Sequence, residues 1–165
     1  TWAILILAAG LTMMITIDLV RYFSRRGRHL FWKHLGRLAS EKEEKGPTTS
    51  LYYAASLLVC VLVFPLYAAI GGVISLAAGD PIAAIVGRRY GRLRIRGKSL
   101  EGGLANFALT FCLVLIFVRS VRLAAAGALA GAVAEMLDIP FLDDNIIVPL
   151  AAAGAMAAAA HFSGM

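Results

Sequence analysis

The sequence predicts an all-α integral membrane protein, a polytopic bundle of about six transmembrane helices forming one domain over residues 1–165. Composition is the first reason. Hydrophobic residues make up 60% of the chain, charged residues 16%, and the mean hydropathy is +0.79. A soluble domain of this size is closer to half apolar and a quarter charged. The second reason is that long apolar stretches alternate with short polar segments that hold the charges.

Six apolar segments are the expected membrane spans. In chain order they cover about residues 2–19, 50–64, 66–79, 102–118, 123–137 and 146–162. The polar segments between them are short, and part of the first, from Phe31 to Leu38, is expected to form an interfacial helix. Small residues at Gly127 and Gly131 suit close packing of the fifth span against its neighbours.

The apolar stretch 51–79 is too long for one upright span. Its 29 residues would reach roughly 43 Å as a helix, whereas the hydrocarbon core is ~30 Å thick. Pro65 lies in its middle, and Gly71 and Gly72 follow. We therefore expect two short helices packed as a hairpin, in preference to one long, tilted and kinked helix.

The distribution of positive charge supports the hairpin and predicts an orientation. Of the 16 Lys and Arg residues, 14 fall in segments 21–49 and 88–98. The hairpin puts both segments on one face, together with the acidic loop 138–145, and basic loops favour the cytoplasm. The net charge of +6 lies in short loops between apolar spans, so it favours a bilayer over a nucleic acid partner.

Acidic residues near the span ends are the candidates for chemistry, because carboxylates in membrane helices are costly and usually functional. They are Asp80 at the end of the third span, Glu101 at the start of the fourth, Glu135 near the inner end of the fifth, and Asp143 and Asp144, next to Asn145, at the start of the last. Carboxylates beside basic residues suit Mg²⁺ and a polyphosphate. Alternatively, Glu101 and Asp143 cap helix starts or pair with arginines.

A glycine-rich basic loop, residues 87–99, precedes the fourth span. It ends in Gly-Lys-Ser, but the interval from Gly91 to Gly97 is one residue too long for a P-loop and no strand is expected before it, so a Walker A motif is excluded. Backbone amides near glycines, with Lys98 and Ser99 at a helix start, still suit an anion. A solvated positive loop is the alternative.

Three blocks of sequence resemble the polyprenol kinase family, which includes dolichol kinase, phytol kinase and the CTP-dependent diacylglycerol kinases. The blocks are GDPIAAIVGRRYG at 79–91, KSLEG at 98–102 and LDDNIIVP at 142–149, with Glu135 between the last two. The resemblance implies a kinase that transfers the γ-phosphate of CTP, with Mg²⁺, to the hydroxyl of a membrane lipid alcohol. Diacylglycerol, a polyprenol or dolichol, and a phytol-like alcohol all remain candidates.

The resemblance also implies roles for individual residues. The catalytic carboxylates would be Asp144, Asp80 and Glu135, with Asp144 the first candidate for the base. The metal ligands would be Asp80, Asp143 and Asp144. The nucleotide contacts would be Gly87, Arg88, Gly91, Lys98, Ser99, Glu101, Gly102 and Asn145. Some relatives have Ala in place of Glu101, which weakens the case for a catalytic role there. CTP is implied by the resemblance, because the residues alone do not distinguish it from ATP.

Two alternatives and one departure accompany this interpretation. A lipid cytidylyltransferase would also use CTP but release pyrophosphate, and a non-enzymatic transporter or scaffold would need no nucleotide. Many family members carry an Arg-Lys-x-x-His motif in a helix before the first span, and nothing equivalent is present in the printed residues. We therefore expect an N-terminal helix of the family to be missing. The oligomeric state stays open, a homodimer included.

Overall fold

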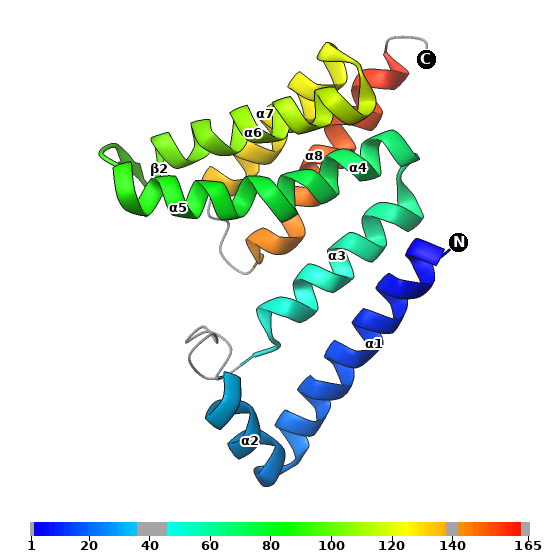
Figure 1. Ribbon diagram of the computed structural model, residues 1–165, viewed down its shortest axis with the longest axis vertical. Coiled ribbons are helices and arrows are strands. Elements are labelled where there is room, and N and C mark those ends of the chain that lie inside the picture. Colours follow the sequence, from blue (N-terminus) through cyan, green and yellow to red (C-terminus); the bar gives the residue numbers. More distant parts are fainter. Residues whose placement is uncertain (1, 36–45, 138–141, 163–165) are drawn as a thin grey trace. The chain divides into compact units, whose positions relative to one another are not determined.

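The computed structural model describes residues 2–35, 46–137 and 142–162. The chain divides into two compact units, Thr1–Leu58 and Val59–Met165. The all-α class is confirmed, since the described residues are helical apart from short connections and one small hairpin (Figure 1). Among them, three helices are long and apolar enough to cross a membrane: Ile4–Phe23, Leu66–Tyr90 and Leu100–Val118.

The first unit contains α1 (Trp2–Phe23), α2 (Arg25–Leu35) and the start of α3 (Thr49–Val63). Helix α1 therefore continues four residues past the predicted end of the first span at 19. The expected interfacial helix begins at Arg25 instead of Phe31, so it includes the Arg-rich segment after Ser24. Its predicted end at Leu38 lies outside the described residues.

An ion pair near the end of α1 is hydrogen-bonded to Thr48, directly before α3. Asp18 accepts hydrogen bonds from the backbone N–H and the hydroxyl of Thr48, at 2.9 and 3.1 Å. Its other carboxylate oxygen lies 3.1 Å from the guanidinium of Arg21. Arg21 also donates to the Gly46 carbonyl and lies over the ring of Phe31. The charge of each partner is thus compensated within this unit.

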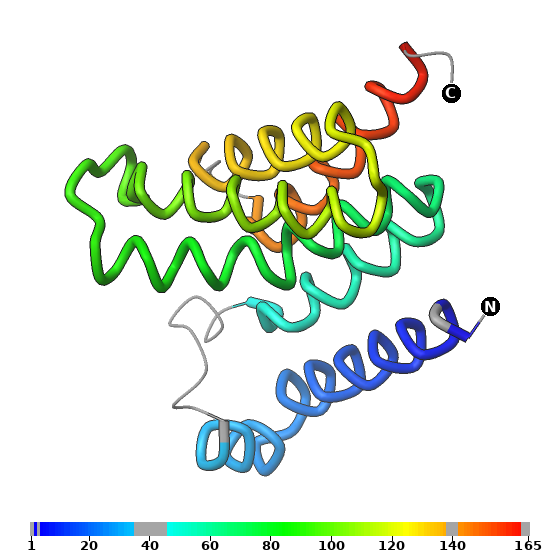
Figure 2. The backbone as a smooth tube through the Cα atoms, turned by 45° about the horizontal axis from the view of Figure 1, so that its top comes forward, coloured from blue at the N-terminus to red at the C-terminus, as the bar shows by residue number. Residues whose placement is uncertain are grey.

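The second unit is a helical bundle with a hairpin at one end. After the end of α3 it contains α4 (Leu66–Ile74), the π-helical turn η2 (Ser75–Gly79), α5 (Asp80–Tyr90), β1 (Arg94–Ile95), β2 (Lys98–Ser99), α6 (Leu100–Val118), α7 (Val121–Met136) and α8 (Asp144–His161). Helix α6 packs against α5 and α7, and α8 packs against α7 and α4 (Figure 2).

The helix that contains the third predicted span does not end at Gly79. The helix continues through Asp80 and Pro81 to Tyr90. Proline lacks an N–H and clashes with the carbonyl four residues earlier, which normally ends a helix. Here the π-turn Ser75–Gly79 directly precedes Asp80, and the wider turn lets the helix pass the proline. Asp80 therefore lies inside a continuous helix.

The basic segment after α5 folds into a two-stranded antiparallel hairpin. Arg94 pairs with Ser99 and Ile95 with Lys98. The two turn residues have positive φ, 50° at Arg96 and 87° at Gly97, as the twist of a tight hairpin requires. The hairpin ends directly at α6, so it fixes Lys98 beside the first turn of that helix.

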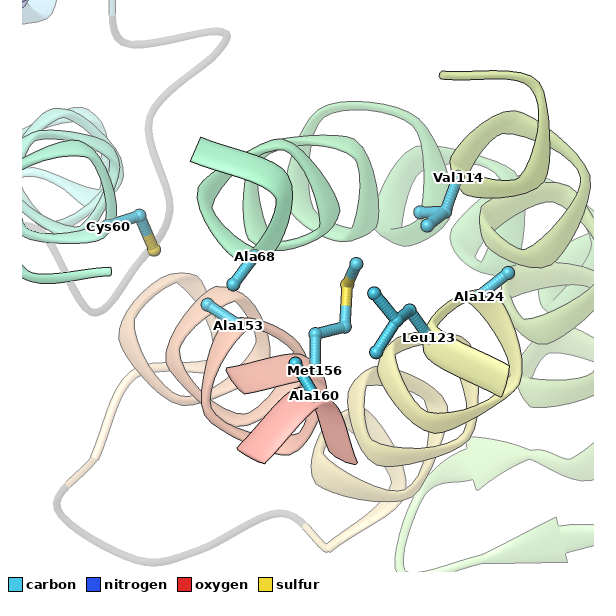
Figure 3. Close-up of a cluster of buried hydrophobic side chains, with 8 residues drawn as sticks. All are labelled: Cys60, Ala68, Val114, Leu123, Ala124, Ala153, Met156 and Ala160. Atoms are coloured by element: carbon cyan, nitrogen blue, oxygen red, sulfur yellow. The ribbon is translucent and has the colours of Figure 1, made fainter. Parts of the chain in front are cut away.

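Small residues allow the helices of the second unit to approach closely, as predicted for Gly127 and Gly131. A Cβ at Gly131 would lie 2.2 Å from the Ser75 hydroxyl, and one at Gly127 would lie 2.7 Å from the Met156 sulfur. Figure 3 shows Met156 among the small apolar side chains of this core. Such contacts drive helix association in lipid, where burial of apolar surface contributes little.

Gly79→Ala should destabilise the protein. A Cβ at this position would lie 2.3 Å from the Asn106 amide oxygen and 2.6 Å from the Thr110 hydroxyl. Overpacking costs about 1–3 kcal/mol, more than the ~1 kcal/mol gained in helix propensity. The thermal unfolding midpoint in detergent should fall. Gly154→Ala is the matched control, because its Cβ would make only an ordinary 3.9 Å contact; equal midpoints for the two variants would contradict the prediction.

Candidate active site

Lys98 is the centre of a charged cluster in the second unit. Its ammonium donates to Asp144 at 2.7 Å and lies 3.9 Å from a carboxylate oxygen of Glu135. The three residues come from β2, the end of α7 and the first turn of α8. The side chains of Lys98 and Asp144 are 31% and 28% exposed, whereas that of Glu135 is 7% exposed. The cluster therefore runs from the protein interior to its surface.

Asp80 belongs to the same cluster, although it makes no hydrogen bond there. Its charge acts on Lys98, Asp144 and Asp143 across the site. Burial by itself lowers the pKa of Lys98, but the hydrogen bond to Asp144 and the charges of Asp144, Glu135 and Asp80 outweigh burial. The pKa of Lys98 is therefore raised above its ordinary value of 10.5. One firmly protonated lysine is thus shared among three carboxylates.

A chain of buried polar side chains extends this cluster into the bundle. Asn106 donates from its amide nitrogen to Glu135 at 2.6 Å, and Thr110 donates to the Asn106 amide oxygen at 3.0 Å. Asn106 and Thr110 are fully buried. The sequence analysis did not select either residue. The sequence did contain a pattern that indicates them: two polar residues four positions apart in an apolar span share one helix face.

The three glycines predicted to contact nucleotide surround the Ser99 side chain. A Cβ at Gly87 or Gly102 would lie 2.6 or 2.9 Å from the Ser99 hydroxyl, and one at Gly91 would lie 2.7 Å from the Ser99 Cβ. Ser99 also caps α6 by accepting from the backbone N–H of Gly102 at 3.0 Å. These four residues bring α5 and α6 into close contact, which places Lys98.

The remaining predicted site residues make local contacts. Glu101 accepts from the backbone N–H groups of Arg92 and Leu93, at 3.0 and 3.2 Å, and so holds the strand leading into the hairpin. Asp143 caps α8 and also accepts from the Asn145 side chain at 2.6 Å. The exposed Arg88 donates to the carbonyl one turn before it. For Asp143 this contact matches the capping alternative, whereas Glu101 holds the segment before the hairpin and Ser99 caps α6.

The oxygen ligands that Mg²⁺ prefers are present at this site. Among the described residues, no group of three or more His, Cys, Asp or Glu side chains is already arranged to hold a metal, and the Lys98 ammonium lies between the carboxylates. Mg²⁺ usually binds proteins through one or two carboxylates, with substrate phosphates and water completing the shell. Asp80 and Asp144 fit that requirement.

Fold and site together define a helical membrane protein with a carboxylate–lysine cluster at one end of a bundle. The chain is 25% identical to the CTP-dependent diacylglycerol kinase 1 of Schizosaccharomyces pombe, covering 90% of this chain and 77% of that protein. It is 31% identical to the dolichol kinase of Saccharomyces cerevisiae, covering 70% and 24%. It is 34% identical to the phytol kinase of Synechocystis, covering 63% and 51%.

These relatives are a diacylglycerol kinase, a dolichol kinase and a phytol kinase, the kinds of kinase that the sequence resembles. The chain is homologous to them, so the resemblance to the polyprenol kinase family is confirmed. The chain spans about half the length or less of the dolichol and phytol kinases that it matches. No protein-family model matches the chain. No solved structure matches it either.

Lys98→Met should destabilise the protein, because it leaves the Asp144 and Glu135 carboxylates without their cation. Partial exposure limits the expected loss to about 1–2 kcal/mol. Since the pKa of Lys98 is raised in the folded protein, its contribution is complete below pH 10.5 and is lost as the pH rises further. Unfolding midpoints of wild type and Lys98→Met should differ at pH 7 and converge in more alkaline solution. A difference that persists there would contradict the prediction, and Lys98→Arg is the control that keeps the charge.

Proposed function

We propose that this protein is a CTP-dependent kinase that phosphorylates the hydroxyl of a membrane lipid alcohol. The observation that carries the proposal is that Lys98, from one family block, lies among Asp80 and Asp144 from the other two blocks and Glu135 from the segment between them. The chain is homologous to proteins named as diacylglycerol, dolichol and phytol kinases. Both observations favour one reaction type, phosphoryl transfer to an alcohol.

The reaction is an in-line displacement at the γ-phosphorus of CTP. The lipid oxygen forms a bond to this phosphorus while the bond to the oxygen bridging the β- and γ-phosphates breaks. CDP leaves, and the hydroxyl proton passes to a carboxylate of the site. Asp144 is the first candidate for this base, since it is half-buried at the open end of the cluster. A positioned base contributes about 10²- to 10⁴-fold to such a transfer.

The other members of the cluster bind the nucleotide. Asp80 and Asp144, with Asp143 beside them, would hold Mg²⁺, which when bound offsets phosphate charge. Lys98 binds phosphate as a fully protonated cation, and Arg88 and Asn145 are further proposed contacts. Gly87, Gly91 and Gly102 act indirectly, by packing around Ser99. The basic hairpin beside the site favours a cytoplasmic position for this end of the unit.

Neither alternative function is favoured. The named relatives are kinases, whereas a lipid cytidylyltransferase would attach a nucleotide and release pyrophosphate. A transporter would need polar groups along a path through the membrane. In the described second unit, the carboxylates of Asp80, Glu135 and Asp144 gather around Lys98 instead.

The direct test is to incubate the purified protein with γ-labelled CTP, Mg²⁺ and a panel of lipid alcohols. The panel contains diacylglycerol, a polyprenol, dolichol and phytol. We expect label in one lipid and an equal amount of CDP, with γ-labelled ATP as a poorer donor. Release of pyrophosphate would indicate a cytidylyltransferase, and absence of labelled lipid with every alcohol would overturn the proposal.

Asp144→Asn should abolish most of this activity while keeping the fold. The amide retains an oxygen that can accept from Lys98 but cannot take the hydroxyl proton. We expect the turnover number to fall about 10²- to 10⁴-fold, with a thermal midpoint close to that of wild type. Near-normal turnover in the folded variant would exclude Asp144 as the base.

A further inference from the structure

A hydrogen-bond chain reaches the charged cluster from inside the bundle and runs Thr110–Asn106–Glu135. We propose that Asn106, oriented by Thr110, is a positioning residue that fixes the Glu135 carboxylate in front of Lys98. This inference rests on the proposed function, because it assigns a role in phosphoryl transfer to residues that would not touch the substrates themselves.

The contacts define the direction of every hydrogen bond in this chain. Thr110 donates to the Asn106 oxygen at 3.0 Å, so the nitrogen of the same amide faces Glu135, to which it donates at 2.6 Å. A carboxylate can only accept, so this orientation of the amide is the one that satisfies all three groups. One Glu135 oxygen is thereby held by Asn106, and the other faces the Lys98 ammonium at 3.9 Å.

Close packing leaves Asn106 little freedom to move. Asn106 and Thr110 are fully buried, and Glu135 is 5% exposed. The backbone of Gly79 lies so close that a Cβ there would overlap the Asn106 amide and the Thr110 hydroxyl. Gly79 directly precedes Asp80, so the segment that presents Asp80 to the cluster also packs against Asn106. The buried contact between Gly79 and Asn106 therefore helps to place both the Asp80 and the Glu135 carboxylates.

This geometry has a consequence for Lys98. Its ammonium bonds directly to Asp144 at 2.7 Å, while Glu135 is kept 3.9 Å away by its bond to Asn106. If Asn106 could not hold it, Glu135 would be able to turn and compete with Asp144 for the ammonium. Displacements of about 1 Å in a phosphoryl-transfer site cost up to about 100-fold in rate. The Thr110–Asn106–Glu135 hydrogen bonds would thus affect the turnover number more than the affinity for CTP.

A double-mutant cycle separates positioning from a merely structural role. Asn106→Leu keeps the branched shape of the side chain and removes the donor, whereas Glu135→Gln removes the charge on which Asn106 is proposed to act. We expect Asn106→Leu to lower the turnover number about 10- to 100-fold with little change in KM for CTP. In the Glu135→Gln background it should have no further effect. Multiplicative losses would overturn the proposal.

Thr110 offers a matched pair of variants. Thr110→Val keeps the shape and loses the hydroxyl that orients Asn106, while Thr110→Ser keeps the hydroxyl. Thr110→Val should lower the turnover number in the same direction as Asn106→Leu, and Thr110→Ser should retain most of it. Equal losses in the two variants would indicate that packing, and not the hydrogen bond, is what matters.

A second measurement does not depend on catalysis. Lys98 is partly exposed, so its acylation by a water-soluble anhydride at fixed pH can be followed by peptide mass spectrometry. If Asn106 keeps Glu135 from closing on Lys98, Asn106→Leu should raise the pKa of Lys98 and slow its acylation, whereas Glu135→Gln should lower this pKa and speed acylation. A decrease of half a pKa unit gives about threefold more free amine. An unchanged rate in Asn106→Leu would overturn the inference.

Ser75→Ala is the control for both measurements. The Ser75 hydroxyl is buried in η2 and has no hydrogen-bond partner among the described residues, so its removal should change neither turnover nor Lys98 acylation. If the wild-type protein labels no lipid, the proposed function fails, and Lys98 acylation still decides whether Asn106 positions Glu135. If lipid is labelled but the cycle is multiplicative and the acylation rate is unchanged, only the inference fails.

Discussion

The organisation of the second unit depends on one constraint, that charges in an apolar bundle must be compensated by nearby groups. Burying an unpaired carboxylate in such surroundings costs more free energy than any single packing contact contributes. Lys98 meets this constraint by lying among Asp144, Glu135 and Asp80. Because those carboxylates come from separate helices, the lysine also acts as a structural cross-link. The same groups that suit a nucleotide thus hold together the end of the bundle that would bind it.

Much of this arrangement could be predicted from the sequence. The apolar stretches gave the all-α class, and Pro65 marks a break between α3 and α4. The blocks around Asp80, Lys98 and Asp144 indicated residues that the structure brings together. Such features are local or compositional, and a charged residue among apolar ones is conspicuous wherever the chain folds. The family resemblance added the order of the blocks, and the named relatives agree with it.

The rest could not be predicted, because it depends on contacts between helices. Gly79, Asp80 and Pro81 look like a helix end in sequence, but a π-turn carries the helix past them. Glycines suited to phosphate binding instead leave space for Ser99. Asn106 gains its role only from Glu135, which lies 29 positions later in the chain. Sequence patterns show the type of group at each position, whereas these roles depend on which residue of another helix that group contacts.

The π-turn Ser75–Gly79 has a consequence for how such a protein could change over time. A π-turn amounts to one residue more than an α-helix needs, and each residue advances an α-helix by about 100°. Loss of any one residue from this turn would leave a regular and still apolar helix. Because the wider turn already absorbs the extra residue, the segments before and after it would keep their relative orientation, and Asp80 would still face Lys98. A single-codon deletion in this turn could therefore leave the site assembled, whereas the same deletion within the regular helix α4 would rotate the two sides of the helix by about 100° relative to each other.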